Sequence, residues 1–249
     1  MNDPNIVAML RIKNESRWIE KVLQVASTIC SEIVVLDDGS TDNTVEICKK
    51  FDEVVDIHQQ SDLPTDQTRD KNILLKMARA RNPDFILSLD GDEIIQPNAK
   101  RILFEELNIL YPDVQVFEFE HLFMWDKPNQ YRYDGIYTSM WRRKLLRMSN
   151  QPKDLHFDET GFAGNGHCPN IPQKSVGWNE SVRSKIKILH YGYYDEEVRQ
   201  KKYRYYTTRD SDKIFDGYRY LISGEGKFSG PHGIKLRTMP EGAFMDFSN

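Results

Sequence analysis

The chain has 249 residues, of which 39% are hydrophobic and 29% charged, and this suits a globular protein of one large domain or two small ones. Its formal net charge of −4 excludes a general attraction to nucleic acid or to an anionic membrane surface. The cysteines Cys30, Cys48 and Cys168 are scattered without a CxxC pair, so they predict neither a disulfide framework nor a zinc ribbon. We find no secretory signal pattern and no apolar run long enough to span a membrane, and we expect a cytoplasmic protein.

The first half of the sequence alternates continuous apolar runs with helical patterns. The runs 5–10 and 84–90 are mostly apolar, as strands buried on both faces are. Segment 16–28 carries its apolar residues on one helical stripe, with Ser16 as the candidate N-cap. Further strands are predicted over 32–38, 53–58 and 114–125, and further helices over 39–50, 68–81 and 98–111. Repeated strand–helix units predict an α/β fold, a mostly parallel sheet flanked by helices.

The composition changes after about residue 125. Residues 125–147 are rich in Tyr, Trp and Arg, and residues 148–180 are loop-like, with many Gly and Pro. Residues 185–206 predict a strand, a short turn and a charged helix. We therefore expect an α/β half over 1–125 and a less regular half over 126–249, packed together as one unit.

Acidic residues end two of the predicted strands. Asp37 and Asp38 follow the run "IVVL", and Asp90 and Asp92 follow the run "FILSL". In a parallel sheet these strand ends lie on one rim, where such sheets bind ligands. Either pair alone is compatible with an ordinary turn, because Asp-Gly-Ser is common turn chemistry. Together they indicate a site where a divalent cation bound to phosphate would relieve the repulsion between carboxylates.

Four motifs occur in order along the first half: "LRIKNES", "IVVLDDGSTDNT", "RDKNILLKMA" and "ILSLDGDEII". A weaker fifth, "ILHYGYYDEE", follows in the second half. In this combination the chain resembles the GT-A glycosyltransferases of family 2, especially bacterial sugar transferases of the lipopolysaccharide-core type. The resemblance covers residues 5–125 well and 180–209 loosely. It implies a Rossmann-like GT-A fold whose C-terminal half faces the acceptor.

The resemblance also implies a UDP-sugar donor and assigns residues to its nucleotide. Asp37 or Asp38 would accept a hydrogen bond from the uracil N3, and the sequence leaves that choice open. Arg11, just past the first strand, would line the same base pocket. Arg69 and Lys71 would meet phosphate or the acids of the DxD motif. Their alternative is a solvated helix face, which we favour for Lys71.

A metal site follows from the same resemblance. Asp92 would bind a divalent cation, Mn²⁺ or Mg²⁺, on the diphosphate, and Asp90 would touch the ribose or a metal-bound water. His190 of "LHYG" would complete the metal shell, and its alternative is a hydrogen-bonded structural histidine. Glu93 has no assigned ligand, and we expect it to form a salt bridge or a helix cap beneath the site.

The sequence offers several candidates for the catalytic base. Inverting members of the family deprotonate the acceptor hydroxyl with an Asp or Glu from the second half, and related core transferases carry a G-x-x-H-E segment there. The corresponding "GNGHCPNIP" has Cys168 where the Glu is expected. His167, Asp158 and Glu159 are the base candidates, His167 because of its intrinsic pKa. A lone thiol is more often an inert packing residue, so we disfavour Cys168 as a nucleophile.

Two other enzyme classes have related motifs. A phosphatase with an Asp-x-Asp nucleophile would carry that motif on its first strand, whereas here it ends the fourth predicted strand. A nucleotidyltransferase would need a glycine-rich loop after the first strand, and "LRIKNES" contains no glycine. Both classes are therefore disfavoured.

Two segments rich in basic and aromatic residues are candidates for contact with the acceptor. "YRYDGIYTSMWRRK" is either a platform for an acceptor sugar or a set of strands with outward arginines. "RQKKYRYYTTR" would meet the diphosphate or the headgroup of a lipid-linked acceptor at a membrane surface, or would form a solvated helix face. We expect a metal-dependent enzyme that transfers a sugar from a UDP-sugar to a glycan or lipid-linked acceptor, with inversion. The alternative is a nucleotide-sugar-binding protein with little or no transferase activity. The sequence "HCP", with Cys168 at the position of the expected Glu, favours this alternative.

Overall fold

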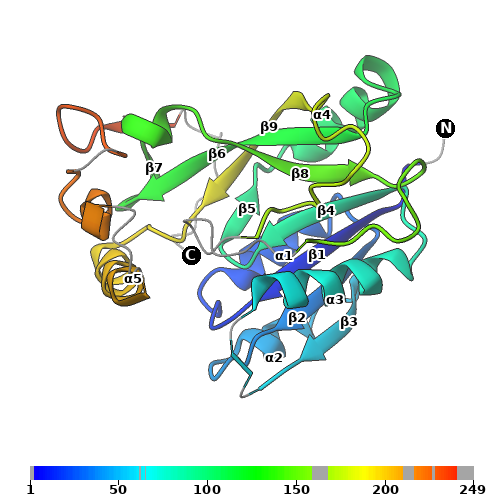
Figure 1. The fold of residues 1–249 in the computed structure, drawn as a ribbon, viewed down its shortest axis with the longest axis horizontal. Coiled ribbons are helices and arrows are strands. Elements are labelled where there is room, and N and C mark those ends of the chain that lie inside the picture. The colour runs from blue at the N-terminus through cyan, green and yellow to red at the C-terminus, as the bar shows by residue number, and fades with distance from the viewer. Residues whose placement is uncertain are drawn as a thin grey trace.

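The structure is a computed structural model that describes most of the chain. The described residues are 3–61, 63, 64, 66–158, 168–209, 216–225 and 228–239. They form one ten-stranded sheet with helices packed on it (Figure 1). The predicted α/β class, a sheet flanked by helices, is confirmed.

Four parallel strands make up the first part of the sheet. Strand β1 (Ile6–Ile12) lies between β2 (Glu32–Asp37) and β4 (Phe85–Asp90), and β3 (Val54–Gln59) forms the edge beyond β2. Because all four run in the same direction, their carboxyl ends share one rim, as the sequence predicts.

Strand β1 is buried on both faces, which explains its continuous apolar run. Its even-numbered residues join the apolar cluster that contains α1 (Ile19–Ala26). Val7 and Met9 join a second cluster, on the opposite face, with Leu74 of α3 (Gln67–Arg79). Successive side chains of a strand point to opposite faces, so one strand fills both layers of the core.

The second part of the sheet mixes both strand directions. Its strands are β5 (Glu93–Ile95), β6 (Val116–Trp125), β7 (Lys127–Arg132), β8 (Trp141–Arg147), β9 (Val182–His190) and β10 (Leu236–Thr238). Strand β8 lies between β4 and β6 and is antiparallel to both, while β9 runs parallel to β6 and antiparallel to β5. Strands β7 and β10 extend the sheet past β6.

The remaining helical segments lie around this sheet. They are α2 (Thr44–Cys48), α4 (Ala99–Glu105), α5 (Glu196–Arg209), the π-helical turn η1 (Glu106–Leu110) and the 3₁₀ turns η2 (Gly135–Thr138) and η3 (Asp216–Leu221). Figure 1 shows α5 at the β7 end of the molecule, far from α2 and β3. None of the helices in the described ranges is long and apolar enough to cross a bilayer.

The start of α1 differs from the prediction. The helix begins at Ile19 with Trp18 in the N-cap position, and no side chain caps it. Ser16 instead donates its backbone N–H to the Asp42 carboxylate, with an N–O distance of 3.2 Å. The prediction of Ser16 as the N-cap was therefore wrong. The backbone of Ser16 instead links the loop after β1 to the loop before α2.

Candidate functional site

A cleft of about 610 Å³ opens where the carboxyl ends of β1 and β4 meet the second part of the sheet. Cavities of this size commonly hold a small ligand. Of the residues predicted from the sequence, Arg11, Lys71, Asp90, Asp92 and His190 line it. The structure thus brings residues from all three thirds of the chain to one place.

Three carboxylates face each other across the rim of this cleft. Glu15 follows β1, and Asp90 and Asp92 flank the turn between β4 and β5. None of the three carboxylates accepts a hydrogen bond from a residue in the described ranges. Burial, followed by the charges of Asp92 and Asp90, raises the pKa of Glu15 to about 9. The rim therefore holds three carboxyl groups that no described residue satisfies with a hydrogen bond, and Glu15 keeps its proton at neutral pH.

Two side chains from the second half approach Asp92. Its Oδ2 lies 3.6 Å from Lys202 Nζ of α5, and its Oδ1 lies 3.8 Å from His190 Nε2 of β9. Burial would lower the pKa of Lys202, but Asp92, Tyr206 and Glu15 outweigh it and raise that pKa. Gly192 makes this approach possible, because a Cβ at that position would collide with the Asp92 carboxylate.

The donor set fits a hard divalent cation that is shared with a ligand. The described residues contain no group of three or more acidic, His or Cys side chains that could hold a metal by themselves. Asp92 and His190 supply a carboxylate and an imidazole side by side, and the buried His190 Nδ1 has no hydrogen-bond partner among the described residues. Cations such as Mg²⁺ are often held by one or two protein carboxylates and completed by substrate phosphates. The site therefore suits Mn²⁺ or Mg²⁺ only together with a phosphate-bearing ligand.

A buried ion pair lies directly beneath the acidic turn. Glu93 Oε2 is 2.5 Å from Lys144 Nζ and accepts the backbone N–H of Asp90 at 3.0 Å, and its Oε1 lies 3.0 Å from His121 Nε2. Burial opposes ionisation, but Lys144 and His121 hold the pKa of Glu93 well below its usual value. The expected salt bridge of Glu93 is confirmed, and it fixes the backbone from which the Asp90 side chain projects.

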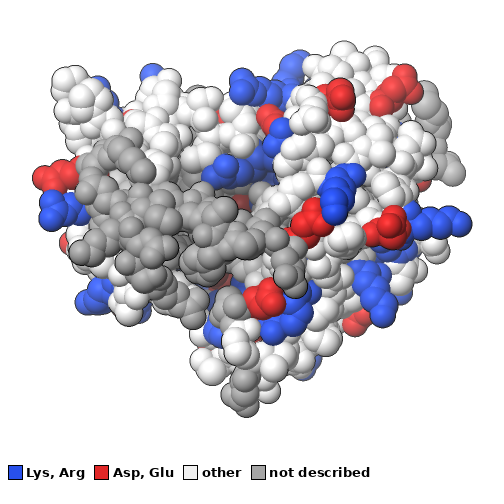
Figure 2. Space-filling model, viewed as in Figure 1, with Lys and Arg blue, Asp and Glu red and all other residues white. Residues whose placement is uncertain are grey.

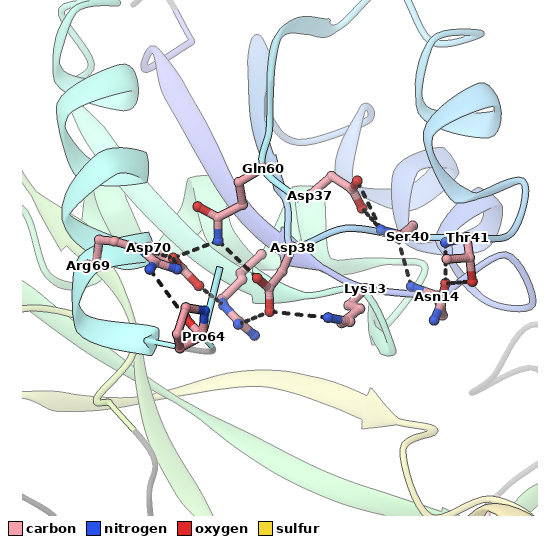
Figure 3. Close-up of polar contacts among 11 residues, drawn as sticks. Lys13, Asn14, Asp37, Asp38, Ser40, Thr41, Gln60, Pro64, Arg69 and Asp70 are labelled. Atoms are coloured by element: carbon pink, nitrogen blue, oxygen red, sulfur yellow. Dashed lines mark hydrogen bonds and ion pairs between the residues drawn. The ribbon is translucent and has the colours of Figure 1, made fainter. Parts of the chain in front are cut away.

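A second charged network closes the side of the cleft beside β2 (Figure 3). Asp38 accepts hydrogen bonds from Arg11 Nη2 at 2.6 Å and from Gln60 Nε2 at 2.9 Å. Asp70, which is fully buried, accepts from Arg11 Nε, from Gln60 and from Arg69. Arg11 and Gln60 thus join two buried acids, and the Arg11 guanidinium remains part of the cleft wall.

Asp37 and Asp38 have different surroundings, although they are adjacent. Both oxygens of Asp37 accept the backbone N–H of Ser40, at 3.1 and 3.2 Å, so Asp37 shapes the Asp-Gly-Ser turn (Figure 3). Asp38 instead contacts the side chains that reach the cleft, Arg11 and, at 3.9 Å, Lys13. The structure thus separates a turn residue from a buried residue that contacts two residues of the cleft wall.

Lys71 does not lie on a solvated helix face, and that part of the prediction was wrong. Its side chain is 6% exposed and donates to the carbonyl oxygens of Cys168 and Pro169, at 3.0 and 2.8 Å. Burial lowers the pKa of Lys71 and raises that of the Cys168 thiol. Cys168 is buried and joins the apolar cluster with α3, as expected for a packing residue.

Aromatic side chains form the opposite wall, from β6, η2, β8 and the segment after β9. Phe123 stacks on Tyr193 with ring centroids 5.8 Å apart and meets Tyr137 edge to face at 4.8 Å. Arg142 of β8 also lines the cleft. The "YRYDGIYTSMWRRK" segment therefore contributes side chains to the cleft and is not simply an outward-facing strand.

Of the three base candidates, Asp158 alone lies within the described residues. Asp158 hydrogen-bonds to Lys174 at 2.7 Å, lies 3.3 Å from His156 Nε2 and is not among the cleft-lining residues. The Lys174 hydrogen bond lowers the pKa of Asp158. Glu159 and His167 lie outside the described residues.

Comparison with known proteins identifies the family. Residues 12–167, more than half of the chain, match the model of glycosyl transferase family 2. The chain belongs to glycosyl transferase family 2. This finding confirms the resemblance drawn from the motifs, and with it the expectation that the protein is a glycosyltransferase.

Three similar proteins place the family-2 chain among its relatives. An uncharacterised protein of Mycobacterium tuberculosis is 23% identical over 94% of this chain and 70% of its own length. The glycosyltransferase GlyG of Streptococcus pneumoniae is 32% identical over 34% of this chain and 28% of its own. Among solved structures, glucosyl-3-phosphoglycerate synthase of M. tuberculosis, in complex with Mn²⁺, UDP and glucosyl-3-phosphoglycerate, matches 48% of this chain and 44% of its own at 19% identity, with a TM-score of 0.35.

The structure adds residues to the family-2 site that the motifs did not single out. These are Glu15, Gln60, Asp70, Arg142 and Lys202. Glu15 and Asp70 belong to the motifs "KNES" and "RDKN", so their position beside the predicted residues was a usable signal. Arg142 and Lys202 are ordinary members of basic segments, and only the fold distinguishes them from their neighbours.

Proposed function

We propose that this family-2 protein transfers a sugar from a UDP-sugar to a hydroxyl group of a glycan or lipid-linked acceptor, with inversion at the anomeric carbon. The observation that carries the proposal is a group of three carboxyl side chains, Glu15, Asp90 and Asp92, inside a cleft of ligand size, to which no residue in the described ranges donates a hydrogen bond. Such a group is costly unless a ligand brings compensating positive charge. A divalent cation carried by a nucleotide diphosphate would provide it.

The cation would be Mn²⁺ or Mg²⁺, held by Asp92 and His190, with Asp90 near the ribose or a metal-bound water. When bound, such a cation offsets the negative charge that grows on a departing diphosphate. Lys202, whose ammonium group already lies 3.6 Å from Asp92, would add a second positive charge beside the leaving group.

The nucleobase would lie against Arg11, near Asp38. Asp38 is the better candidate for the uracil N3–H, because Asp37 is occupied by the turn at Ser40. Each oxygen of Asp38 has one described side-chain donor and can accept a further hydrogen bond. Arg69 and Lys71 then act through Asp70 and through the 168–169 backbone, rather than as free phosphate ligands.

In the transfer step the acceptor oxygen forms a bond to the anomeric carbon, and the bond from that carbon to the diphosphate oxygen breaks. UDP leaves with the electron pair, and a base takes the hydroxyl proton. We retain His167, Glu159 and Asp158 as candidates for this base. Asp158 is the weakest of them, since its lysine partner lowers its pKa and so reduces its basicity.

Thermal denaturation with UDP and Mn²⁺ tests the donor site. We expect UDP with Mn²⁺ to raise the Tm, and neither component alone to do so to the same extent. Asp92→Asn should abolish this shift, whereas Glu197→Gln, an exposed carboxylate on α5, should leave it unchanged. An unaltered shift in Asp92→Asn would remove Asp92 from the metal site.

The base candidates are tested by transfer and hydrolysis assays across UDP-sugars. Single Ala substitutions of His167, Glu159 and Asp158 should leave UDP binding intact, and one of them should reduce turnover by on the order of 100-fold or more. The second candidate function is a binding protein without turnover, favoured by Cys168 at the position of the expected Glu, with a buried thiol of raised pKa. Intact UDP binding with no transfer and no hydrolysis would select that function.

A further inference from the structure

Two stretches of the second half of the chain pack against helix α3. One contains Phe157 and the other contains Cys168, and both residues join the apolar cluster that includes Leu74 of the helix. Both are buried, with 1% and 6% of their surface exposed. Apolar contact brings the two stretches to one helix, but it does not fix their backbones, because it is non-directional.

Side chains of α3 also bind the backbones of both stretches. Asn72 donates its Nδ2–H to the carbonyl oxygen of Phe157 at 3.0 Å and accepts the N–H of Phe157 at 2.8 Å. Gln67 accepts the N–H of Cys168 at 2.9 Å. Hydrogen bonds are directional, so these contacts fix backbone positions that apolar packing leaves free.

Lys71 of the same helix connects the two stretches. Its Nζ donates to the carbonyl oxygens of Cys168 at 3.0 Å and of Pro169 at 2.8 Å. The same Nζ lies 6.0 Å from the centroid of the Phe157 ring, at the limit of a cation–π contact. The ammonium group therefore contacts both stretches at once.

Lys71 has no acidic partner among the described residues. It is 6% exposed, and no described carboxylate forms an ion pair with its ammonium group. Burying an ammonium group without a carboxylate partner costs stability. Natural proteins keep such exceptions mainly where function requires them. A function is therefore expected for the backbone that Lys71 binds.

The backbone that Lys71 binds belongs to the cleft. Residues 168–170 line the cleft, and the chain between the two anchored stretches includes the base candidates Glu159 and His167. A base must lie within hydrogen-bond reach of the proton that it removes, and a displacement of about 1 Å can lower a rate about 100-fold. Displacement of the backbone on either side of these candidates would therefore lower turnover.

We propose that Lys71 is a positioning residue for the transfer step, which holds the cleft backbone at 168–169 beside Phe157 and so keeps the base within reach of the acceptor hydroxyl. This inference rests on the proposed transferase function and adds to it a residue that acts through the backbone, without touching the substrate. Gln67 and Asn72 share this role. Lys202 differs, because its ammonium group lies beside the acidic rim.

Steady-state kinetics of the full chain test the proposal, with the UDP-sugar that gives the highest rate of transfer or hydrolysis. Lys71→Met keeps the length of the side chain but removes its donors, and it should reduce kcat by about 100-fold. The Kd of UDP with Mn²⁺, measured by calorimetry, should change less than about twofold. Lys71→Arg restores the donors and should retain more turnover than Lys71→Met. Lys76→Met, an exposed position on α3, is the matched control and should behave as wild type.

Hydrogen exchange measures the anchoring independently of turnover. In Lys71→Met the backbone amide of Cys168 should exchange about tenfold faster or more, because the stretch loses an anchor. If Lys71→Met does not fold, Asn72→Ala provides the same test, since it removes the bonds to Phe157 and should accelerate exchange there while lowering kcat. The amides of β1 and β4 should keep their protection in both variants, which separates a local release from general unfolding.

The possible failures lead to different conclusions. A loss of UDP affinity of about tenfold or more in Lys71→Met, with exchange unchanged, overturns the proposal and makes Lys71 a ligand of the donor. An unchanged kcat also overturns it, and faster exchange in that case shows an anchor with a structural role only. If wild type binds UDP but neither transfers nor hydrolyses any UDP-sugar, the proposed function fails by itself, and exchange at Cys168 still decides whether Lys71 anchors the cleft backbone.

Discussion

The charged side chains around the cleft fall into two groups, which differ in whether a described residue pairs with them. Beside β2, and beneath the β4–β5 turn, acids and bases are paired: Asp70 has three donors, and Glu93 is held by Lys144 and His121. On the surfaces that face the cavity, Glu15, Asp90 and Arg142 lack such partners in the described part of the chain. We infer that the paired charges stabilise the fold and that the unpaired charges bind ligands.

This contrast makes opposite predictions for the two groups. Removing a paired charge should reduce stability, because its partner is left buried without compensation. Removing an unpaired charge should cost little stability or even increase it, and the loss should fall on ligand binding. The four predictions below test this contrast, from the largest expected effect to the smallest.

Glu93→Gln should cause the largest loss. It leaves the Lys144 ammonium buried opposite a neutral amide, and we expect the free energy of unfolding to fall by about 3–5 kcal/mol. Urea denaturation measures this change. The double variant Glu93→Gln/Lys144→Met should recover part of the loss, since it removes the unpaired charge, and a single-variant loss below about 1 kcal/mol would contradict the pairing argument.

Asp70→Asn tests the network beside β2. Asn cannot accept from Arg11, Gln60 and Arg69 as a carboxylate does, and we expect the free energy of unfolding to fall by about 2–3 kcal/mol. Glu32→Gln is the control, because its ion pair with Arg81 is exposed and should contribute little to stability. Equal effects of the two substitutions would mean that burial of the network does not matter.

Glu15→Gln should act in the opposite direction in metal-free protein. The pKa of Glu15 is raised from 4.5 to about 9, so between these values the unfolded chain releases a proton that the folded chain keeps. The stability of the wild type should therefore fall as pH rises through this window, by at most about 1.4 kcal/mol per pH unit. The Gln variant should lack this slope, so its stability relative to the wild type should increase as the pH rises through the same window. Denaturation in EDTA at several pH values measures both, with Glu20→Gln as an exposed control.

Lys202→Met should produce the smallest change, and it should alter the affinities for Mn²⁺ and for UDP in opposite directions. Removing the ammonium beside Asp92 leaves the carboxylates more attractive to a cation, so Mn²⁺ should bind about three- to tenfold more tightly, which is roughly 1 kcal/mol. UDP should bind more weakly by a similar factor, because a positive charge beside its diphosphate is lost. Lys201→Met, an exposed neighbour paired with Glu197, is the control. Affinities that move together would show that Lys202 acts through structure instead.

The positions of individual acids could be predicted from the sequence to different degrees. Asp90 and Asp92 were placed correctly at the rim, because a strand end in a parallel sheet has a fixed location. The separation of Asp37 from Asp38 could not be predicted, since adjacent residues in a turn differ by side-chain direction alone. The burial of Lys71 was missed because its partners are carbonyl oxygens almost a hundred residues away.

The sequence by itself determined the alternation of strands and helices, the family and the acidic strand ends. These features are local, since they depend on hydrophobic period and on short motifs. Only the tertiary structure decided that β8 lies antiparallel between β4 and β6, that Lys202 meets Asp92 and that Arg142 has no partner among the described residues. Such contacts join residues distant in sequence, and their formation depends on how the whole sheet packs, which no local pattern encodes.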